Sequence, residues 1–362
     1  MIHIDNLLNE LVAKEASDLH LRVGEPPVMR IHGILTRTKY PILLDSDMYD
    51  LIHPIMNPDK EARFEQTMEL DTSYAIPGLS RFRVNIFRQQ GHIGAVLRVI
   101  PFRIKTIDEL GLPQTTKDIS MLPRGLVLVT GPTGSGKSTS LAAMINLINE
   151  SKPANIVTIE DPIEYVHRDK MSAVNQREVG VDTHSFSDAL KHVMRQNPDV
   201  ILVGEMRDLE TIKLAITAAE TGHLVFATLH TTDAPQTVDR IIDVFEPEAQ
   251  QQIRMQLSTT LQAVISQTLL MKKGGNGRVA AFEVMRCTSA IRTLIREGKT
   301  HQLSTDIQTG QQHGMQTLDN SLLNLVQKGL VEYEDALAKS SNPGDFKVRA
   351  ERFGLVTEMS LF

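Results

Sequence analysis

Cysteine and long apolar stretches are what this chain of 362 residues most clearly lacks. Its single cysteine, Cys287, excludes an intrachain disulfide and a zinc site built from cysteines alone, and it fits a reducing compartment. No stretch reaches the roughly eighteen apolar residues of a membrane-spanning helix. Residues 1–21 carry acidic side chains instead of the basic start and apolar core of a signal peptide. We therefore predict a cytoplasmic protein with no direct membrane insertion, whose membrane association would come through a partner.

A surplus of positive charge is also missing. Lys and Arg number 38 against 44 Asp and Glu, which gives a net charge of -6. This balance, with no basic arm, argues against a general polyanion binder, although a local basic groove is compatible with it. We therefore expect no nucleic acid among the partners. Hydrophobic residues make up 41% of the chain, which is long enough for two or three domains.

One motif has the spacing G-x-x-x-x-G-K-[ST] and lies between an apolar run at 126–130 and a helix-like segment at 139–149. Glycines let backbone N–H groups converge on phosphate oxygens, and the helix start adds the positive end of its dipole. Lys137 supplies an ammonium for the β- and γ-phosphates, and the Ser138 hydroxyl can ligate Mg²⁺. The motif therefore predicts an ATP and Mg²⁺ site rather than a glycine turn with a surface lysine. Its expected nucleotide-binding residues are Gly131, Pro132, Thr133, Gly134, Ser135, Gly136, Lys137, Ser138 and Thr139.

The first 105 residues have the pattern of a small α+β domain. Helices are expected at 3–16 and 45–56, and strands at 17–22, 28–31, 70–75, 81–87 and 94–100. Strict alternation in 81–87 places Arg81, Arg83 and Asn85 on one face. Residues 101–123 look like a connection that holds a short helix.

From residue 124 onward, apolar strands alternate with helices, which predicts a parallel sheet covered on both faces. The expected strands are 126–130, 155–159, 200–203 and 224–229, and the expected helices are 137–150, 187–195, 208–221 and 248–268. No strong strand is expected after about residue 283, and short helices are expected at 289–297, 317–328 and 333–339. The predicted domains are an N-terminal domain at 1–105, a linker at 106–123, an ATPase core at 124–285 and a helical C-terminal region at 286–362.

Two acidic clusters fall at the ends of predicted parallel strands, where the ligands of such sheets collect. Hydrolysis of a triphosphate needs a held metal and an oriented water. We expect Glu205 to support Mg²⁺, through a water, and Glu164 to orient the attacking water as the base. Glu160 and Asp161 either take part or only hold the turn, and Asp208 is expected to cap a helix.

A histidine ends another predicted strand of the same sheet. His230 follows the apolar run 224–229 and is surrounded by hydroxyl side chains. Two interpretations stay open for it, a structural histidine and a sensor of the γ-phosphate. His223, at the start of that strand, would lie at the opposite edge, so we expect it to be structural.

Together these blocks resemble the secretion ATPases of the PilT/GspE superfamily. The matching blocks are a Walker A box at 131–138, an Asp box at 158–164, an atypical Walker B box at 197–208 and a His box at 222–232. The segments 16–21 and 78–85 also match, so the resemblance covers nearly the whole chain. Gly204, directly before the acid of the Walker B box, is an irregularity of that block.

The resemblance implies an N-terminal PAS-like α+β domain followed by a RecA-like P-loop ATPase domain, assembled into a homohexamer. It implies a motor at the cytoplasmic face of the inner membrane that acts on an inner-membrane platform protein and, indirectly, on pilin. It also implies that Glu164 is the catalytic glutamate, Glu205 the Walker B acid and His230 the histidine of the His box. Arg81 and Arg83 match arginines that reach nucleotide in similar proteins, and one moved by a neighbouring domain would couple hydrolysis to ring deformation.

Two features favour the retraction branch of this superfamily over its assembly and secretion branches. The chain lacks the four-cysteine zinc insertion and the longer N-terminal region of those branches. Residues 290–297 read A-I-R-T-L-I-R-E, close to the retraction motif A-I-R-N-L-I-R-E, with Thr293 as the departure. The open alternatives are an accessory PilU-type motor, a pilus assembly or secretion ATPase, a nucleic-acid translocase and a nucleotide-gated module with negligible turnover.

Overall fold

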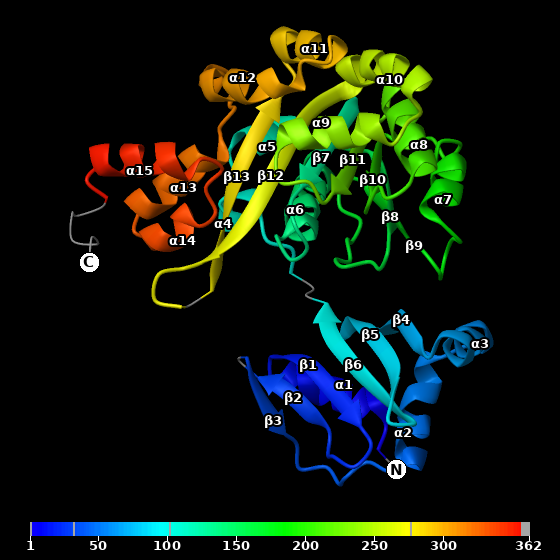
Figure 1. Ribbon diagram of the computed structural model, residues 1–362. Helices are drawn as coiled ribbons and strands as arrows, with labels where there is room; N and C mark the ends of the chain where they lie inside the picture. The colour runs from blue at the N-terminus through cyan, green and yellow to red at the C-terminus, as the bar shows by residue number, and fades with distance from the viewer. Residues whose placement is uncertain (1, 32, 101–102, 276, 356–362) are drawn as a thin grey trace. The chain divides into compact units, whose positions relative to one another are not determined.

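The computed structural model describes residues 2–31, 33–100, 103–275 and 277–355. Contacts divide the chain into two compact units, Met1–Arg103 with Glu164–Val166, and Ile104–Ile163 with His167–Phe362. Each unit has a β-sheet and a hydrophobic core of its own (Figure 1). The predicted connection at 101–123 and the predicted C-terminal region include residues 101–102 and 356–362, which lie outside the described residues.

The first unit is built on a six-stranded antiparallel sheet of order β3-β2-β1-β6-β5-β4. Phe82, Val84 and Ile86 of β5 are buried, whereas Arg81 and Arg83, which alternate with them, are not, as the sequence pattern predicts. The strands are β1 (Ala16–Arg22), β2 (Val28–Ile31), β3 (Ile34–Arg37), β4 (Glu69–Ile76), β5 (Ser80–Gln89) and β6 (His92–Ile100). The helices are α1 (Ile4–Ala13), α2 (Asp45–Ile52), η1 (His53–Ile55) and α3 (Pro58–Thr67).

Two elements of this unit were not expected from the sequence, β3 and α3. All four residues of β3 are exposed, so the strand has no buried face to mark it. Helix α3 buries only Phe64, and its ends are set by Asn57, whose side chain accepts from Lys60 N–H, and by Met68 in the left-handed region. Neither β3 nor α3 has the regular spacing of apolar residues from which a strand or a helix is predicted.

The second unit contains a seven-stranded sheet of order β13-β12-β7-β11-β10-β8-β9. The six strands from β12 to β9 are parallel, and β13 pairs with β12 in the antiparallel sense. The strands are β7 (Gly125–Thr130), β8 (Asn155–Glu160), β9 (Ala173–Glu178), β10 (Val200–Val203), β11 (Leu224–Leu229), β12 (Leu261–Met271) and β13 (Arg278–Arg286). The four strands expected in this sheet are all present, and β9, β12 and β13 are additional.

Helices cover this sheet on both faces, as predicted. Leu126 and Leu128 of β7 pack into the cluster that includes α7 to α12, whereas Val127 and Val129 pack into the cluster that includes α4 to α6. Successive strand residues point to opposite faces, so one apolar strand contributes to both clusters. The helices are α4 (Ile107–Leu110), α5 (Thr115–Ser120), α6 (Lys137–Ser151), α7 (Phe186–Val193), α8 (Leu209–Glu220), α9 (Ala234–Asp243), α10 (Pro247–Thr260), α11 (Ser289–Arg296) and α12 (Leu303–Thr309).

The helix predicted at 248–268 is wrong in its second half. Helix α10 ends at Thr260, and the chain continues as strand β12 between β7 and β13 (Figure 1). Because β12 is covered on both faces, Ala263, Val264 and Ile265 are all buried and show no period of two. Arg292 donates to the carbonyls of Ser258 and Thr259, at 2.7 and 2.9 Å, which helps to end α10 there. Strand β13 (Arg278–Arg286) was not expected either. No named strand follows Arg286 in the described part of the chain, which agrees with the expectation of no strong strand after about residue 283.

A small helical layer completes the described part of the chain. Leu322 and Phe346 of this layer are fully buried in a cluster with Leu270 and Ala281 of the β12–β13 hairpin. The helices are α13 (Leu318–Gln327), α14 (Tyr333–Leu337) and α15 (Pro343–Arg352), and the short η2 (Thr300–Gln302) and η3 (Gln311–His313) precede them. Among the described residues, no helix combines the length and the apolar content needed to cross a bilayer.

Candidate active site

The phosphate-binding motif forms the loop between β7 and α6. Gly131 has φ +141° and Gly136, the residue before α6, has φ +91°, a conformation that favours glycine. A Cβ added at Gly131 would also overlap with the carbonyl oxygen of Gln267 and lie 2.7 Å from Ser135 Oγ. Glycine is therefore required at Gly131 both by conformation and by the close approach of strand β12.

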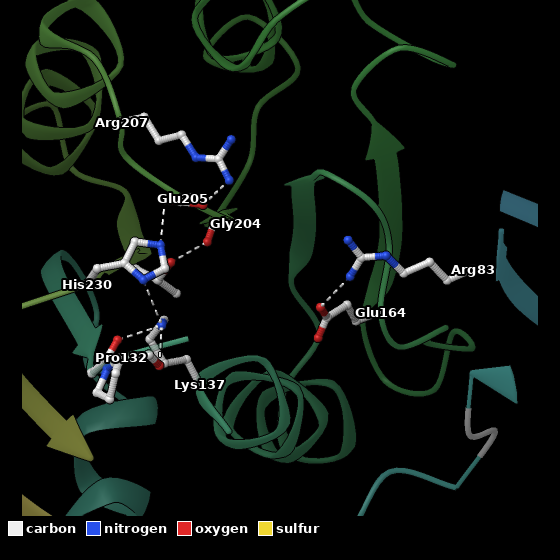
Figure 2. Close-up of polar contacts among 10 residues, drawn as sticks. Arg83, Pro132, Lys137, Glu164, Gly204, Glu205, Arg207 and His230 are labelled. Carbon is white, nitrogen blue, oxygen red and sulfur yellow. Dashed lines mark hydrogen bonds and ion pairs between the residues drawn. The ribbon is translucent and has the colours of Figure 1, made fainter. Parts of the chain in front are cut away.

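Lys137 begins α6 and turns its ammonium back over the loop. Its Nζ donates to the carbonyl of Gly131 at 2.7 Å and to that of Pro132 at 3.2 Å (Figure 2). The same Nζ lies 3.5 Å from His230 Nδ1. The ammonium is thus held against the loop backbone and beside His230. Ser138 and Thr139 follow in the first turn of α6.

His230 connects the loop to the acid at the end of β10. Its Nε2 lies 2.8 Å from Glu205 Oε1, and Glu205 Oε2 lies 2.7 Å from Arg207 Nη2 (Figure 2). A neutral ring protonated on Nε2 satisfies both neighbours, because Nε2–H then donates to Glu205 and Nδ1 accepts from Lys137. The result is a continuous chain of polar contacts from Lys137 to Arg207.

The strand ends explain why Glu205 and His230 meet. Strands β10 and β11 are parallel neighbours, with Val203 opposite Ala227, so the residues after them leave the sheet at the same edge. Thr228 Oγ1 donates to the Gly204 carbonyl at 2.5 Å. A Cβ on Gly204 would lie 3.1 Å from the Ile159 carbonyl of β8, so the irregular glycine permits close packing there.

The charge balance around Glu205 favours its ionised form. Burial opposes ionisation, but the hydrogen bond and charge of Arg207, together with His230, outweigh it and hold the pKa of this carboxyl below its ordinary value. The bond to Glu205 in turn raises the pKa of Arg207. An ionised carboxylate at the end of β10, close to the phosphate loop, is suited to holding a metal-bound water.

The acids of the predicted Asp box are distributed over two environments. Glu160, the last residue of β8, accepts from Thr158 Oγ1 at 2.6 Å and from Gln176 Nε2 at 3.1 Å. Asp161 is exposed, and its charge contributes to the raised pKa of Arg207. Glu160 therefore lies in a hydrogen-bonded position between β8 and β9, and Asp161 lies at the sheet edge.

The contact chain does not include Glu164, which groups with the first compact unit. Within that unit, Arg83 Nη1 lies 3.7 Å from Glu164 Oε1 (Figure 2). Arg81 donates from Nη2 to Ser73 Oγ at 2.7 Å. The structure thus brings together Lys137, Glu205 and His230 within the second unit, and it pairs Glu164 with Arg83 within the first. The roles of Glu164, Arg81 and Arg83 toward nucleotide stay predictions.

Two residues near the site were missed by reasoning from the sequence. Arg207 had a signal, since it is a cation two residues after the acid at a strand end. Gln267 had none, because its strand was expected to be helical. The two predicted structural roles hold: Asp208 accepts from Thr211 N–H at 2.8 Å as the N-cap of α8, and His223 Nδ1 lies 2.9 Å from the Ala218 carbonyl.

Among the described residues, no group of three or more His, Cys, Asp or Glu side chains is placed to hold a metal. A magnesium ion bound with a nucleotide does not require such a group, because phosphate oxygens and water supply most of its ligands. Ser138 in the first turn of α6 and the ionised Glu205 fit this arrangement.

Fold and site together define a P-loop nucleotide-binding protein of mixed α/β architecture with two sheets. A family model described as "Type II/IV secretion system protein" matches residues 1–338. The chain belongs to this family.

The most similar relatives include pilus proteins. The type IV pilus retraction ATPase PilT of Pseudomonas aeruginosa is 54% identical over 343 residues, which are 95% of this chain and 99% of that protein. The type IV pilus ATPase PilU of the same organism is 41% identical over 348 residues, 96% of this chain and 91% of that protein. A crystal structure of the pilus retraction motor PilT with bound ADP has a TM-score of 0.89 at 46% identity, and the match covers 96% of this chain and all of that one.

Proposed function

We propose that this chain is an ATP-hydrolysing motor that powers type IV pilus retraction, the withdrawal of pilin that drives twitching motility. The observation that carries the proposal is the row of polar contacts from Lys137 through His230 to Glu205 beside the P-loop. The relatives of this protein include a pilus retraction ATPase. A phosphate cradle alone would suit a nucleotide-gated switch. An ionised acid and a histidine aligned on the cradle favour turnover.

Each site residue has a distinct role in this proposal. The loop N–H groups and Lys137 hold the phosphates, and the Ser138 hydroxyl binds Mg²⁺, which neutralises phosphate charge when bound. Glu205 holds a water of that ion. His230 reports the presence of the γ-phosphate to Glu205. Glu164 orients the attacking water as base, and normal hydrolysis by a Glu164→Gln protein would remove it from that role.

The remaining parts of the proposal concern architecture and partners. We infer a PAS-like domain at 1–105, a linker at 106–123, a RecA-like core at 124–285 and a helical C-terminal region at 286–362. A homohexamer bound to an inner-membrane platform protein at the cytoplasmic face would transmit force to pilin, with Arg81 and Arg83 reaching nucleotide. Two compact units with separate cores support a motor that works by movement between them.

Phosphate release by purified protein tests the chemistry. Lys137→Ala is expected to reduce Mg²⁺-dependent ATP hydrolysis by at least about 100-fold, since it removes the cation that faces the phosphates. Lys152→Ala removes an equal charge just beyond the other end of α6 and is the matched control, with activity expected within twofold of wild type. Equal activity of the Lys137→Ala protein would contradict the proposal.

The direction of the motor is tested in cells. A strain that lacks this chain should keep surface pili and lose twitching motility, and the Lys137→Ala form should not restore motility. Bald cells would point to pilus assembly instead. Normal retraction in the deletion strain would favour the second candidate, an accessory PilU-type motor, for which the Thr293 departure is the motivating observation.

A further inference from the structure

Gln267, in the middle of β12, contacts the phosphate loop near both of its ends. The side chain is 3% exposed, and its Nε2 donates to the Ser135 carbonyl at 2.7 Å. The backbone carbonyl of Gln267 packs against Gly131, where it leaves no room for a Cβ. Its Nε2 would lie 3.2 Å from a Cβ on Gly136. One residue, distant in sequence, therefore packs against the glycines that begin and end the loop.

The neighbouring residue of the same strand provides a second attachment. Thr130 Oγ1 donates to Ser266 Oγ at 2.8 Å, and both side chains are buried. Strands β7 and β12 are parallel, with Ser266 directly opposite Thr130. Strand β12 thus fixes the residue before the loop through Ser266, and the last peptide before Gly136 through Gln267. The loop is held by a strand that is not part of the motif.

The bond to the Ser135 carbonyl has a directional consequence. In a trans peptide, the C=O and the N–H of the next residue point to opposite sides. With the Ser135 carbonyl held toward β12, the N–H of Gly136 points away from β12. Loop N–H groups are the donors that hold phosphate oxygens in this class of site. A turned peptide would present a carbonyl acceptor to the phosphates in place of a donor.

We propose that Gln267 is a positioning residue for nucleotide binding. Its side-chain amide holds the Ser135–Gly136 peptide in the orientation in which the Gly136 N–H donates to a nucleotide phosphate. The inference rests on the proposed function in that it assumes a nucleotide in the loop. Gln267 acts through the loop backbone and touches no reacting atom.

Nucleotide binding by variants of similar shape tests this role. Gln267→Met removes the donor and is expected to raise the Kd for ADP and the KM for ATP about tenfold, in the range of one hydrogen bond to a charged group. The kcat is expected to change less than threefold, because bound nucleotide can still select the correct peptide orientation. Gln262→Met is the matched control, since Gln262 lies in the same strand but bonds to Arg292, at 2.9 Å, instead of the loop. We expect the control to bind ADP within twofold of wild type.

A readout specific to phosphate separates positioning from general stability. The Kd for AMP, measured by competition, should change less than twofold in Gln267→Met. The proposed bond orients the loop that holds the second and third phosphates, which AMP lacks. Equal losses for AMP and ADP, or ADP binding within twofold of wild type, would overturn the inference. Gln267→Leu, which also lacks the donor and carries no charge, gives the same comparison if Gln267→Met does not fold. A wild-type protein that binds no ADP would instead overturn the proposed function.

Discussion

Glu205 and Glu283 lie at the same seven-stranded sheet but in opposite surroundings. Glu205 follows β10 beside Arg207 and His230, and its pKa is held below the ordinary value. Glu283 lies in β13, is 8% exposed and accepts from Ala234 N–H at 2.8 Å. Burial, assisted by the charges of Asp233 and Asp319 and opposed by the Ala234 N–H bond, raises the pKa of Glu283 to about 7.

The two carboxyls differ in their surroundings, and this difference assigns Glu205 to the site and Glu283 to the packing of the fold. A carboxylate that is ionised and next to a histidine at the phosphate loop can bind a metal-bound water and respond to substrate. A carboxyl that is buried near other acids is most stable when protonated, and a hydrogen bond to the start of α9 is its observed contribution. The same residue type thus serves the site in one place and the packing of α9 on β13 in the other.

The largest effect is expected from Glu205→Gln. This change keeps the size of the side chain but removes the charge that faces Arg207 and His230, so kcat should fall by about 100-fold or more with a small change in KM. Stability should change little, because Arg207 and His230, the two partners that lose the charge, are 65% and 49% exposed and stay solvated. Steady-state phosphate release over a range of ATP concentrations measures both constants.

The control for this prediction is another ion-paired glutamate of the same unit. Glu210 of α8 pairs with Lys191 at 2.6 Å on the protein surface. Glu210→Gln is expected to keep kcat within twofold of wild type, since exposed pairs contribute little. If both variants lost activity equally, or if Glu205→Gln turned over ATP at the normal rate, Glu205 would have no special role.

The part of the site that could be predicted from the sequence depends on local patterns of apolar and polar residues. Lys137, Glu205 and His230 could be placed together because each follows or begins an element of a parallel sheet, and the carboxyl ends of such strands share one edge. Apolar runs bounded by turns mark those strands without knowledge of their partners. The phosphate loop and half of the site were therefore predictable.

The remainder depends on pairings between distant segments. The contact of Gln267 with Ser135 requires β12 to lie beside β7, and a strand buried on both faces shows the same apolar density as a buried helix. The bond of Glu283 to Ala234 likewise joins β13 to the start of a helix that was not predicted. Glu164 lies in a loop, and loop conformation is set by contacts that no periodicity records.

An intermediate effect, on stability rather than activity, is expected from Glu283→Gln. The folded pKa of about 7 lies above the ordinary 4.5, so between these values the folded state binds more protons than the unfolded state, and wild-type stability falls as pH rises. Glutamine keeps the acceptor for Ala234 and carries no charge. Each pKa unit corresponds to about 1.4 kcal/mol, so the variant should gain up to about 3 kcal/mol over wild type above pH 7 and nothing below pH 4.5.

Unfolding of the two proteins at pH 5 and pH 8 measures this gain. The difference in stability should be several times larger at pH 8, while ATP hydrolysis by the folded variant stays within twofold of wild type. A difference that is the same at both pH values would show that Glu283 does not titrate between them, and the contrast with Glu205 would then be lost.

The smallest effect is expected from His230, which lies between the two ends of the contact chain. His230→Ala leaves Lys137 and Glu205 in place but removes the ring between them, so kcat should fall about tenfold, the equivalent of one hydrogen bond to a charged group. His223, at the opposite end of β11, provides the matched control, since it bonds within its own turn and His223→Ala should keep kcat within twofold. Phosphate-release rates at saturating ATP measure both. A loss confined to His230 would mean that this end of β11 serves the chemistry, whereas equal losses would mean that both histidines only support the strand.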